Sequence, residues 1–80
     1  MTKNQKIEEQ RRKIGELLVK YREKKGFTQV YAASQAGIKN SLLSFYEQGC
    51  RKINQEHLTK LASLYGISEK ALIGGIISTE

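Results

Sequence analysis

One short stretch of this chain carries side chains suited to hydrogen bonding with a partner. Residues 40–48 read NSLLSFYEQ, in which Asn40, Ser41, Ser44 and Phe45 are interspersed with apolar positions. On a helix these four side chains fall on one side, away from the apolar ones. An amide such as Asn40 can bind an adenine edge with two hydrogen bonds, serine is permissive, and an exposed Phe45 can contact a thymine methyl. The pattern favours the reading of base edges, although Phe45 could instead be buried against a partner protein.

Polar side chains on either side of this stretch could hold phosphate groups. Gln29 falls in the first turn of an expected helix, where backbone N–H groups and the helix dipole favour an anion. Phosphate contacts of this kind set a register on DNA without reading its sequence. Each of these side chains could equally be a solvated surface group. The full set of phosphate candidates is Thr28, Gln29, Lys39, Arg51, Lys52 and Asn54.

The chain offers little else with which to do chemistry. It has one histidine, His57, and one cysteine, Cys50, so it cannot assemble a zinc site of four such ligands. It contains no phosphate-binding loop and no dinucleotide-binding fingerprint. We therefore expect no catalytic residue, no metal and no cofactor, and an enzyme is not the expected function.

The elements that must position these residues read as helices. Apolar residues recur at helical spacing from Ile7 to Tyr21, with Thr2 and Gln5 as a possible cap; Gly15 weakens the middle slightly, and Gly26 ends the segment. Cap and stop residues then predict helices over 28–36, from residue 39 or 40 to 48, over 55–65 and over 69–73. The sequence thus predicts an all-α, compact five-helix bundle. Its expected core includes Leu58, Leu61, Ala62, Tyr65, Ile67 and Leu72.

The second and third predicted helices lie too close together to pack side by side. Only Gly37, Ile38 and Lys39 separate them, and such a turn sets two helices at a steep angle, as in a helix-turn-helix. Ala33 supplies the small residue that the crossing needs, and Gly37 tolerates the positive φ of the turn.

Several linked motifs carry a family resemblance over about residues 14–72. The segments IGELLVKYREKKG, TQ…AA…AGIKNSLLSFYEQG and LTKLASLYGIS resemble the lambda-repressor-like, Xre-type helix-turn-helix domain of phage and bacterial regulators. Ala32 and Ala36 stand where that family usually has larger aliphatic residues. Tyrosines stand at three further positions where it usually has Leu or Ile, namely Tyr21, Tyr46 and Tyr65.

The resemblance implies a function and roles for particular residues. It implies double-stranded DNA binding by a transcriptional regulator, with Asn40, Ser41 and Phe45 as base readers and Gln29 on the DNA backbone. It also implies a salt bridge between Arg22 on the first helix and Glu47 on the third. Repression, and not activation, is the expected effect on transcription, because the chain carries no activation or ligand domain. Two alternatives stay open: an antitoxin of the same fold, and a protein-interaction module that has lost DNA binding.

Charge and the tail indicate the remaining partners. Residues 1–25 hold nine basic and four acidic side chains, which suggests an acidic partner, although solubility alone could account for this charge. The basic first helix lacks the Trp and Phe of a membrane-surface helix, so we expect no membrane partner. Eighty residues suggest one domain over residues 1–80, and with no run of about 18 apolar residues, no signal-like segment and a lone Cys50 we expect it to be cytoplasmic. Residues 1–13 extend the first helix, and 73–80 form a tail. The apolar residues Leu72, Ile73, Ile76 and Ile77 would align on a helix and are the candidates for a homodimer interface. Given Gly74 and Gly75, the same tail could instead pair with its copy as a short strand, and it could equally be disordered or fold back on its own core.

Overall fold

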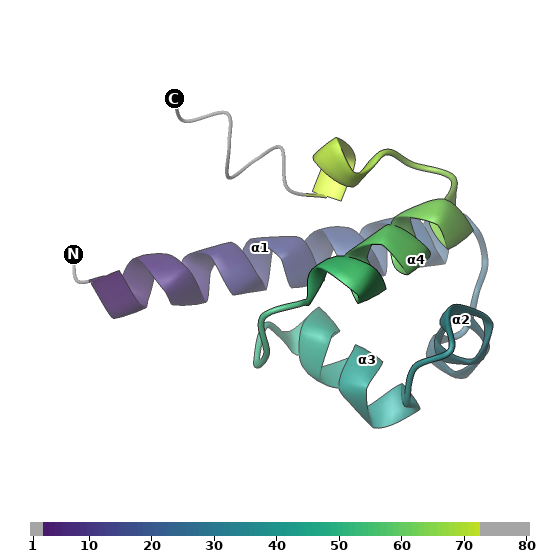
Figure 1. Cartoon of the computed structure of the whole chain (residues 1–80), viewed down its shortest axis with the longest axis horizontal. Helices are drawn as coiled ribbons and strands as arrows, with labels where there is room; N and C mark the ends of the chain where they lie inside the picture. The colour runs from purple at the N-terminus through teal and green to yellow at the C-terminus, as the bar shows by residue number, and fades with distance from the viewer. Residues whose placement is uncertain (1–2, 73–80) are drawn as a thin grey trace.

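Four α-helices and a final helical turn make up the described part of the chain (Figure 1). The computed structural model describes the backbone of residues 3–72 and the side chains of residues 8–72. The helices are α1 (Lys3–Lys24), α2 (Gln29–Ala36), α3 (Asn40–Gln48) and α4 (Gln55–Tyr65), and residues 69–72 form the turn. The all-α prediction is confirmed. The proposed cap of the first helix at Thr2 and Gln5 lies outside the described residues.

The long helix α1 serves as the support for the other three. Figure 1 shows α4 lying along the C-terminal half of α1, with α3 below them and the N-terminal part of α1 extending past the bundle. The axes of α2 and α3 cross steeply, and the turn between them is short. This arrangement holds α3 by its inner side and leaves its other side at the edge of the domain.

Local signals account for where the short helices begin and end. The Thr28 hydroxyl accepts a hydrogen bond from the Tyr31 N–H at 3.0 Å, and Asn54 Oδ1 accepts one from the His57 N–H at 2.8 Å. Such caps contribute about 1 kcal/mol each. Gly37 ends α2 with φ of 70°, a left-handed conformation that glycine adopts without strain. In contrast, α3 begins after Lys39, whose side chain makes no capping bond.

The buried core draws on every element of the bundle. Small residues lie where helices cross, and larger residues fill the space between α1, α3 and α4. Packing at this density fixes the relative positions of the helices. The buried apolar side chains are Leu18, Ala32, Ala33, Ala36, Leu43, Tyr46, Ile53, Leu58, Leu61, Ala62, Tyr65 and Leu72.

The two buried tyrosines of this core, Tyr46 and Tyr65, differ in whether their hydroxyl groups have a hydrogen-bond partner. The Tyr46 hydroxyl lies 2.8 Å from His57 Nδ1, which joins α3 to the start of α4. The Tyr65 hydroxyl is buried and has no hydrogen-bond partner within the described residues. Because burial disfavours the phenolate, it raises the pKa of Tyr65 to about 12. Tyr65 therefore acts as an apolar volume filler that stays neutral.

Gly15 marks a close approach of α1 and α3. A Cβ at this position would lie 2.5 Å from the Glu47 carbonyl oxygen and 2.6 Å from that of Tyr46. The prediction that Gly15 merely weakens the helix was therefore incomplete. Its missing side chain lets the backbone at the end of α3 rest on α1.

We expect Gly15→Ala to destabilise the protein even though alanine is the better helix former. The added methyl group would push the backbones of α1 and α3 apart, and overpacking of this kind outweighs a gain of about 1 kcal/mol in helix propensity. Chemical denaturation should show a net loss of about 1–2 kcal/mol in the free energy of unfolding. The exposed neighbour Glu16→Ala serves as the control, with a change within about 0.5 kcal/mol. A Gly15→Ala protein as stable as the wild type would contradict the close approach.

Candidate nucleic-acid interface

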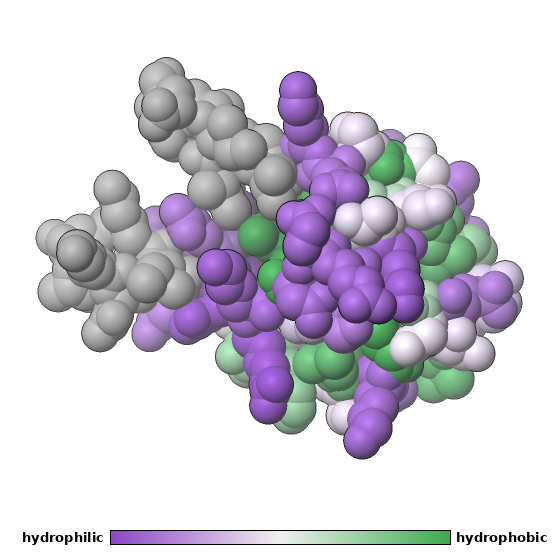
Figure 2. All heavy atoms as spheres, in the orientation of Figure 1, coloured by the Kyte–Doolittle hydropathy of each residue, from purple (hydrophilic) through white to green (hydrophobic). Residues whose placement is uncertain are grey.

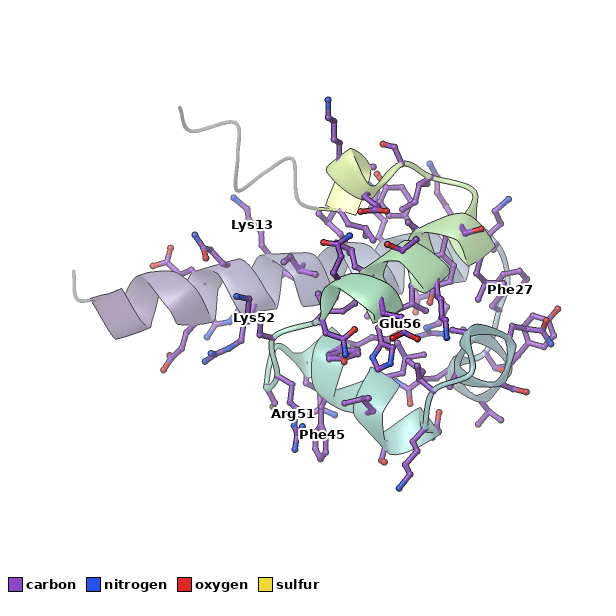
Figure 3. All side chains as sticks on the ribbon, in the orientation of Figure 1. Lys13, Phe27, Phe45, Arg51, Lys52 and Glu56 are labelled. Carbon is purple, nitrogen blue, oxygen red and sulfur yellow. The ribbon has the colours of Figure 1, made fainter. Side chains whose placement is uncertain are left out.

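The two faces of α3 differ sharply in exposure. Leu43 and Tyr46 are buried at 0% and 4% exposure, whereas Phe45 on the other side is 43% exposed. Asn40 and Ser41 are exposed as well. Figure 3 shows Phe45 and Arg51 projecting from the same edge of the domain. The structure thus brings the predicted base readers together on one outward face of α3.

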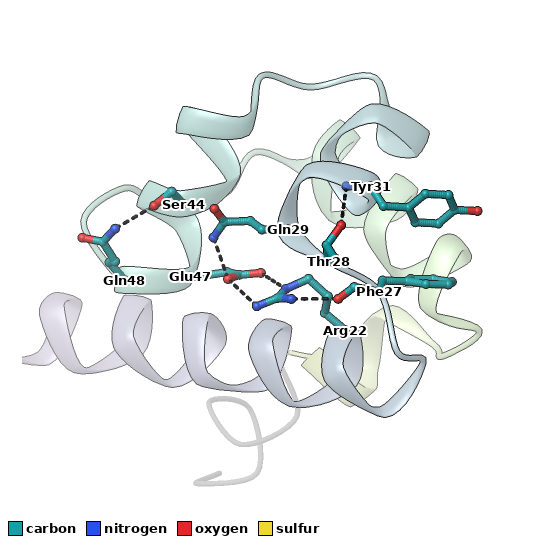
Figure 4. A network of polar contacts seen from close by, with 8 residues as sticks. All are labelled: Arg22, Phe27, Thr28, Gln29, Tyr31, Ser44, Glu47 and Gln48. Carbon is teal, nitrogen blue, oxygen red and sulfur yellow. Dashed lines mark hydrogen bonds and ion pairs between the residues drawn. The ribbon is translucent and has the colours of Figure 1, made fainter.

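A hydrogen bond organises the C-terminal part of this outward face. Gln48 Nε2 donates to Ser44 Oγ at 2.7 Å (Figure 4). The bond occupies an acceptor site of Ser44 and leaves its O–H free to donate. Sequence reasoning missed this contact, although two polar side chains four residues apart on a helix are a recognisable signal.

The predicted phosphate contacts fall into two groups. Lys39, Arg51 and Lys52 are exposed, and none of them forms an ion pair within residues 8–72. Thr28 and Asn54 use their oxygens as helix caps. Capping consumes an acceptor in each case, so the Thr28 O–H and the Asn54 NH₂ remain available as donors to a phosphate oxygen.

Gln29 occupies a different environment from the other phosphate candidates. Its Nε2 donates to Glu47 Oε1 at 2.9 Å, across from α2 to α3. No local sequence pattern predicts this bond, because it joins residues that are 18 positions apart. Gln29 therefore helps to hold α3 through its hydrogen bond to Glu47. It also lies at the end of α2 that is expected to face DNA.

The carboxylate of Glu47 is the centre of a polar network that joins three segments (Figure 4). Arg22 Nε donates to Glu47 Oε2 at 2.7 Å, and Arg22 Nη2 donates to Oε1 at 3.3 Å. Arg22 Nη1 also donates to the Phe27 carbonyl oxygen at 2.8 Å, which fixes the loop before α2. The two side chains predicted to pair thus lie in contact and are only 13% and 5% exposed.

Electrostatics favours the charged form of Arg22. The hydrogen bond to Glu47 raises the pKa of Arg22, an effect that outweighs the opposite influence of burial. The Arg22 guanidinium therefore stays charged at neutral pH. An ion pair buried to this degree is costly to break, because removing one partner leaves the other charge without compensation.

Exposed apolar surface gathers near the two crossing helices. In Figure 2, apolar side chains show along the lower and right edges of the visible face, where Figure 1 places α3 and α2. Among residues 8–72, the large hydrophobic side chains with the most exposure are Val30 at 64%, Tyr31 at 46% and Phe45 at 43%. The sequence prediction singled out Phe45 and did not anticipate the exposure of Val30 and Tyr31.

The dimer candidates require a correction. Leu72 is 1% exposed and packs in the core of its own domain, so its side chain does not form an outward surface for a second copy. It closes the bundle because the turn at residues 69–72 folds against α4. Gln55 Nε2 and Thr59 Oγ1 both donate to the Glu69 carboxylate, at 2.6 and 2.9 Å. Ile73, Ile76 and Ile77 lie outside the described residues.

Membrane-spanning helices and metal-binding clusters are both absent from the described part of the chain. None of its helices combines the length and apolarity needed to cross a bilayer. No group of three or more His, Cys, Asp or Glu side chains there is arranged to hold a metal ion. His57 is engaged by Tyr46, and Cys50 is exposed.

A protein-family model described as helix-turn-helix matches residues 18–72, which include the network, the turn and α3. This chain belongs to the helix-turn-helix family, of the lambda-repressor-like, Xre type. Within the helix-turn-helix domain, α2 and α3 are the two helices that give the family its name. Residues 18–72 contain both of these helices and the short turn between them.

Two known helix-turn-helix proteins illustrate the match. The HTH-type transcriptional regulator ImmR of Bacillus subtilis (strain 168) is 39% identical over 61 residues, which are 76% of this chain and 48% of ImmR. The chain thus spans about half the length of that relative. The crystal structure of the restriction-modification controller protein C.AhdI from Aeromonas hydrophila matches with a TM-score of 0.75 and 29% identity, covering 78% of this chain and 94% of that chain.

We expect Glu47→Ala to destabilise the helix-turn-helix domain, with a loss that approaches about 3–5 kcal/mol only as the pair approaches full burial, because Arg22 would keep a largely desolvated charge without its partner. A double-mutant cycle with Arg22→Ala, followed by chemical denaturation, should reveal a coupling well above 0.5 kcal/mol, the usual limit of additivity. The exposed pair of Glu56 and Lys60, with a 3.1 Å contact, is the matched control and should couple by about 0.5 kcal/mol or less. Additive effects of Arg22 and Glu47 would show that the two side chains act independently.

Proposed function

We propose that this chain is a transcriptional regulator that binds double-stranded DNA sequence-specifically, with α3 in the major groove. The observation that carries the proposal is the division of α3 into a buried inner face and an exposed, largely polar outer face. Family membership supports the same function. A formal net charge of +6 adds a sequence-independent attraction to the DNA backbone.

Base reading falls to the outer face of α3. Asn40 and Ser41 occupy the N-terminal end of the helix, which usually touches the bases first. Asn40 can bind adenine through two hydrogen bonds, and Ser41 and Ser44 can donate to several bases. Phe45, exposed on the same face, suits a thymine methyl. The preferred site is therefore expected to contain A·T pairs under α3.

Backbone contacts flank the reading helix at both ends. Lys39 lies directly before α3, and Arg51 and Lys52 follow it. Thr28 and Asn54, at the starts of α2 and α4, add uncharged donors. Such contacts fix the register on the duplex. A protein held in this way occludes its site, so repression is the proposed sign of regulation.

The assignment of roles can be tested by comparing Asn40→Ala with Lys52→Ala. Asn40→Ala should cost about 1–3 kcal/mol of binding free energy on the preferred duplex and relax specificity at one base position. Lys52→Ala should weaken binding to all sequences alike and reduce the salt slope by about one.

Fluorescence anisotropy titrations at several salt concentrations would measure both effects. The duplexes are a preferred site selected from a random pool and an unrelated sequence of equal length. If the two variants lost affinity equally on both duplexes, α3 would not be the reading element.

A homodimer on two related half-sites completes the proposal. A domain with one reading helix contacts few base pairs, and pairing two half-sites about one helical turn apart is the usual remedy. Because Leu72 is buried in its own domain, the interface is assigned to the apolar residues that follow it, Ile73, Ile76 and Ile77.

Truncation after Ile73 should weaken self-association, because it removes Ile76 and Ile77 and with them most of the proposed apolar interface. Analytical ultracentrifugation of the full and truncated chains at several concentrations would measure the change. Circular dichroism of the truncated chain is the control for folding. A truncated chain that dimerises as well as the full chain would place the interface elsewhere.

A second candidate function is binding to a protein partner. The exposure of Val30 and Tyr31 on α2 favours it, because large apolar side chains on a small surface often mark contact with another protein. DNA binding that weakens steeply with salt would support the regulator instead.

A further inference from the structure

The contact between Gln29 and Glu47 joins the far ends of the helix-turn-helix. Gln29 is the first residue of α2, and Glu47 is the next-to-last residue of α3. The short turn around Gly37 already joins the near ends of the two helices. The hydrogen bond from Gln29 Nε2 to Glu47 Oε1, at 2.9 Å, ties the ends that the turn leaves free. Two connections at opposite ends fix the angle between the helices, which one connection cannot do.

The two oxygens of Glu47 are held from different helices. Oε2 accepts from Arg22 Nε on α1 at 2.7 Å, whereas the shortest contact of Oε1 is with Gln29 on α2. Arg22 Nη2 reaches Oε1 only at 3.3 Å. A hydrogen bond to an ionised acceptor is stronger than one between neutral groups, and the Glu47 side chain is only 5% exposed. The orientation of this carboxylate therefore depends on Gln29 as well as on Arg22.

We propose that Gln29 is a positioning residue for base recognition, which fixes the angle between α2 and α3 through Glu47 and thereby sets where Asn40 and Ser41 lie. This inference rests on the proposed DNA-binding function. It assigns Gln29 a role beyond the phosphate contact that its place in α2 predicts. The two roles have different consequences, since a phosphate contact strengthens binding to every sequence equally. A positioning contact instead changes how well the protein discriminates between sequences.

The test replaces Gln29 by methionine, which has a similar length and no N–H donor. Affinities of wild type and Gln29→Met are measured by fluorescence anisotropy over a range of salt. The probes are the duplex selected by the wild type from a random pool and an unrelated duplex of equal length. We expect the ratio of the two affinities to fall about tenfold, as for loss of one hydrogen bond to a charged group, with the salt slope unchanged. Lys52→Ala is the matched control, and should leave the ratio unchanged while lowering the slope.

Two further measurements separate positioning from a general loss of structure. Gln29→Lys keeps an N–H donor for Glu47 and should retain most of the discrimination. Denaturation of the DNA-free protein in a Gln29→Met and Glu47→Gln double-mutant cycle should show coupling between the two residues.

The binding results distinguish a failure of the positioning role of Gln29 from a failure of the proposed DNA-binding function. A wild type that binds both duplexes equally would overturn the proposed function together with the inference. A wild type that discriminates, alongside a Gln29→Met variant that discriminates equally well, would overturn the inference alone.

Discussion

A single carboxylate, whose side chain is almost inaccessible to solvent, holds α3 in place. Glu47 accepts hydrogen bonds from Arg22 on α1 and Gln29 on α2, and Arg22 in turn binds the Phe27 carbonyl oxygen. Taking these charges out of water is expensive, so the arrangement is stable only while every partner is in position. Any rotation of α3 would move the carboxylate of Glu47 away from the guanidinium of Arg22. The apolar core determines that α3 packs against α1, and the polar network determines in which orientation it does so.

The backbone adds a second constraint on the same helix. At Gly15 the carbonyl oxygens of Tyr46 and Glu47 approach α1 more closely than any side chain would allow. On the α4 side, the Tyr46 hydroxyl meets His57. The end of α3 is thus restrained by backbone packing and an ion pair from α1, and by the hydrogen bond between Tyr46 and His57 of α4. Tyr65 contributes volume to the same core without a hydrogen-bond partner in the described part of the chain.

Helix starts and helix faces, which depend on neighbouring residues, could be predicted from the sequence. Contacts between residues far apart in the sequence mostly could not. The caps Thr28 and Asn54 predicted the starts of α2 and α4, because a capping oxygen and the backbone N–H that donates to it lie within one turn. Helical periodicity gave the inner and outer faces of α3. The hydrogen bond from Gln29 to Glu47 and the close approach of α3 to Gly15 depend on how the helices pack against one another. No pattern of neighbouring residues predicts that packing. Arg22 and Glu47 were anticipated through the family resemblance, not through their spacing.

The division of α3 into a buried inner face and an exposed outer face also affects which residues of the domain can be exchanged without loss of the fold. Asn40, Ser41 and Phe45 are exposed, and within residues 8–72 their side chains make no hydrogen bond that the fold requires. Exchanging them therefore alters the outer surface at little thermodynamic cost, whereas replacing Glu47 or Gly15 removes or obstructs a contact that holds α3 against α1. The same scaffold can accumulate new surface chemistry while its architecture stays constant. The exposed side chains of Asn40, Ser41 and Phe45 and the side chain of Glu47, which anchors the helix, thus belong to one nine-residue helix.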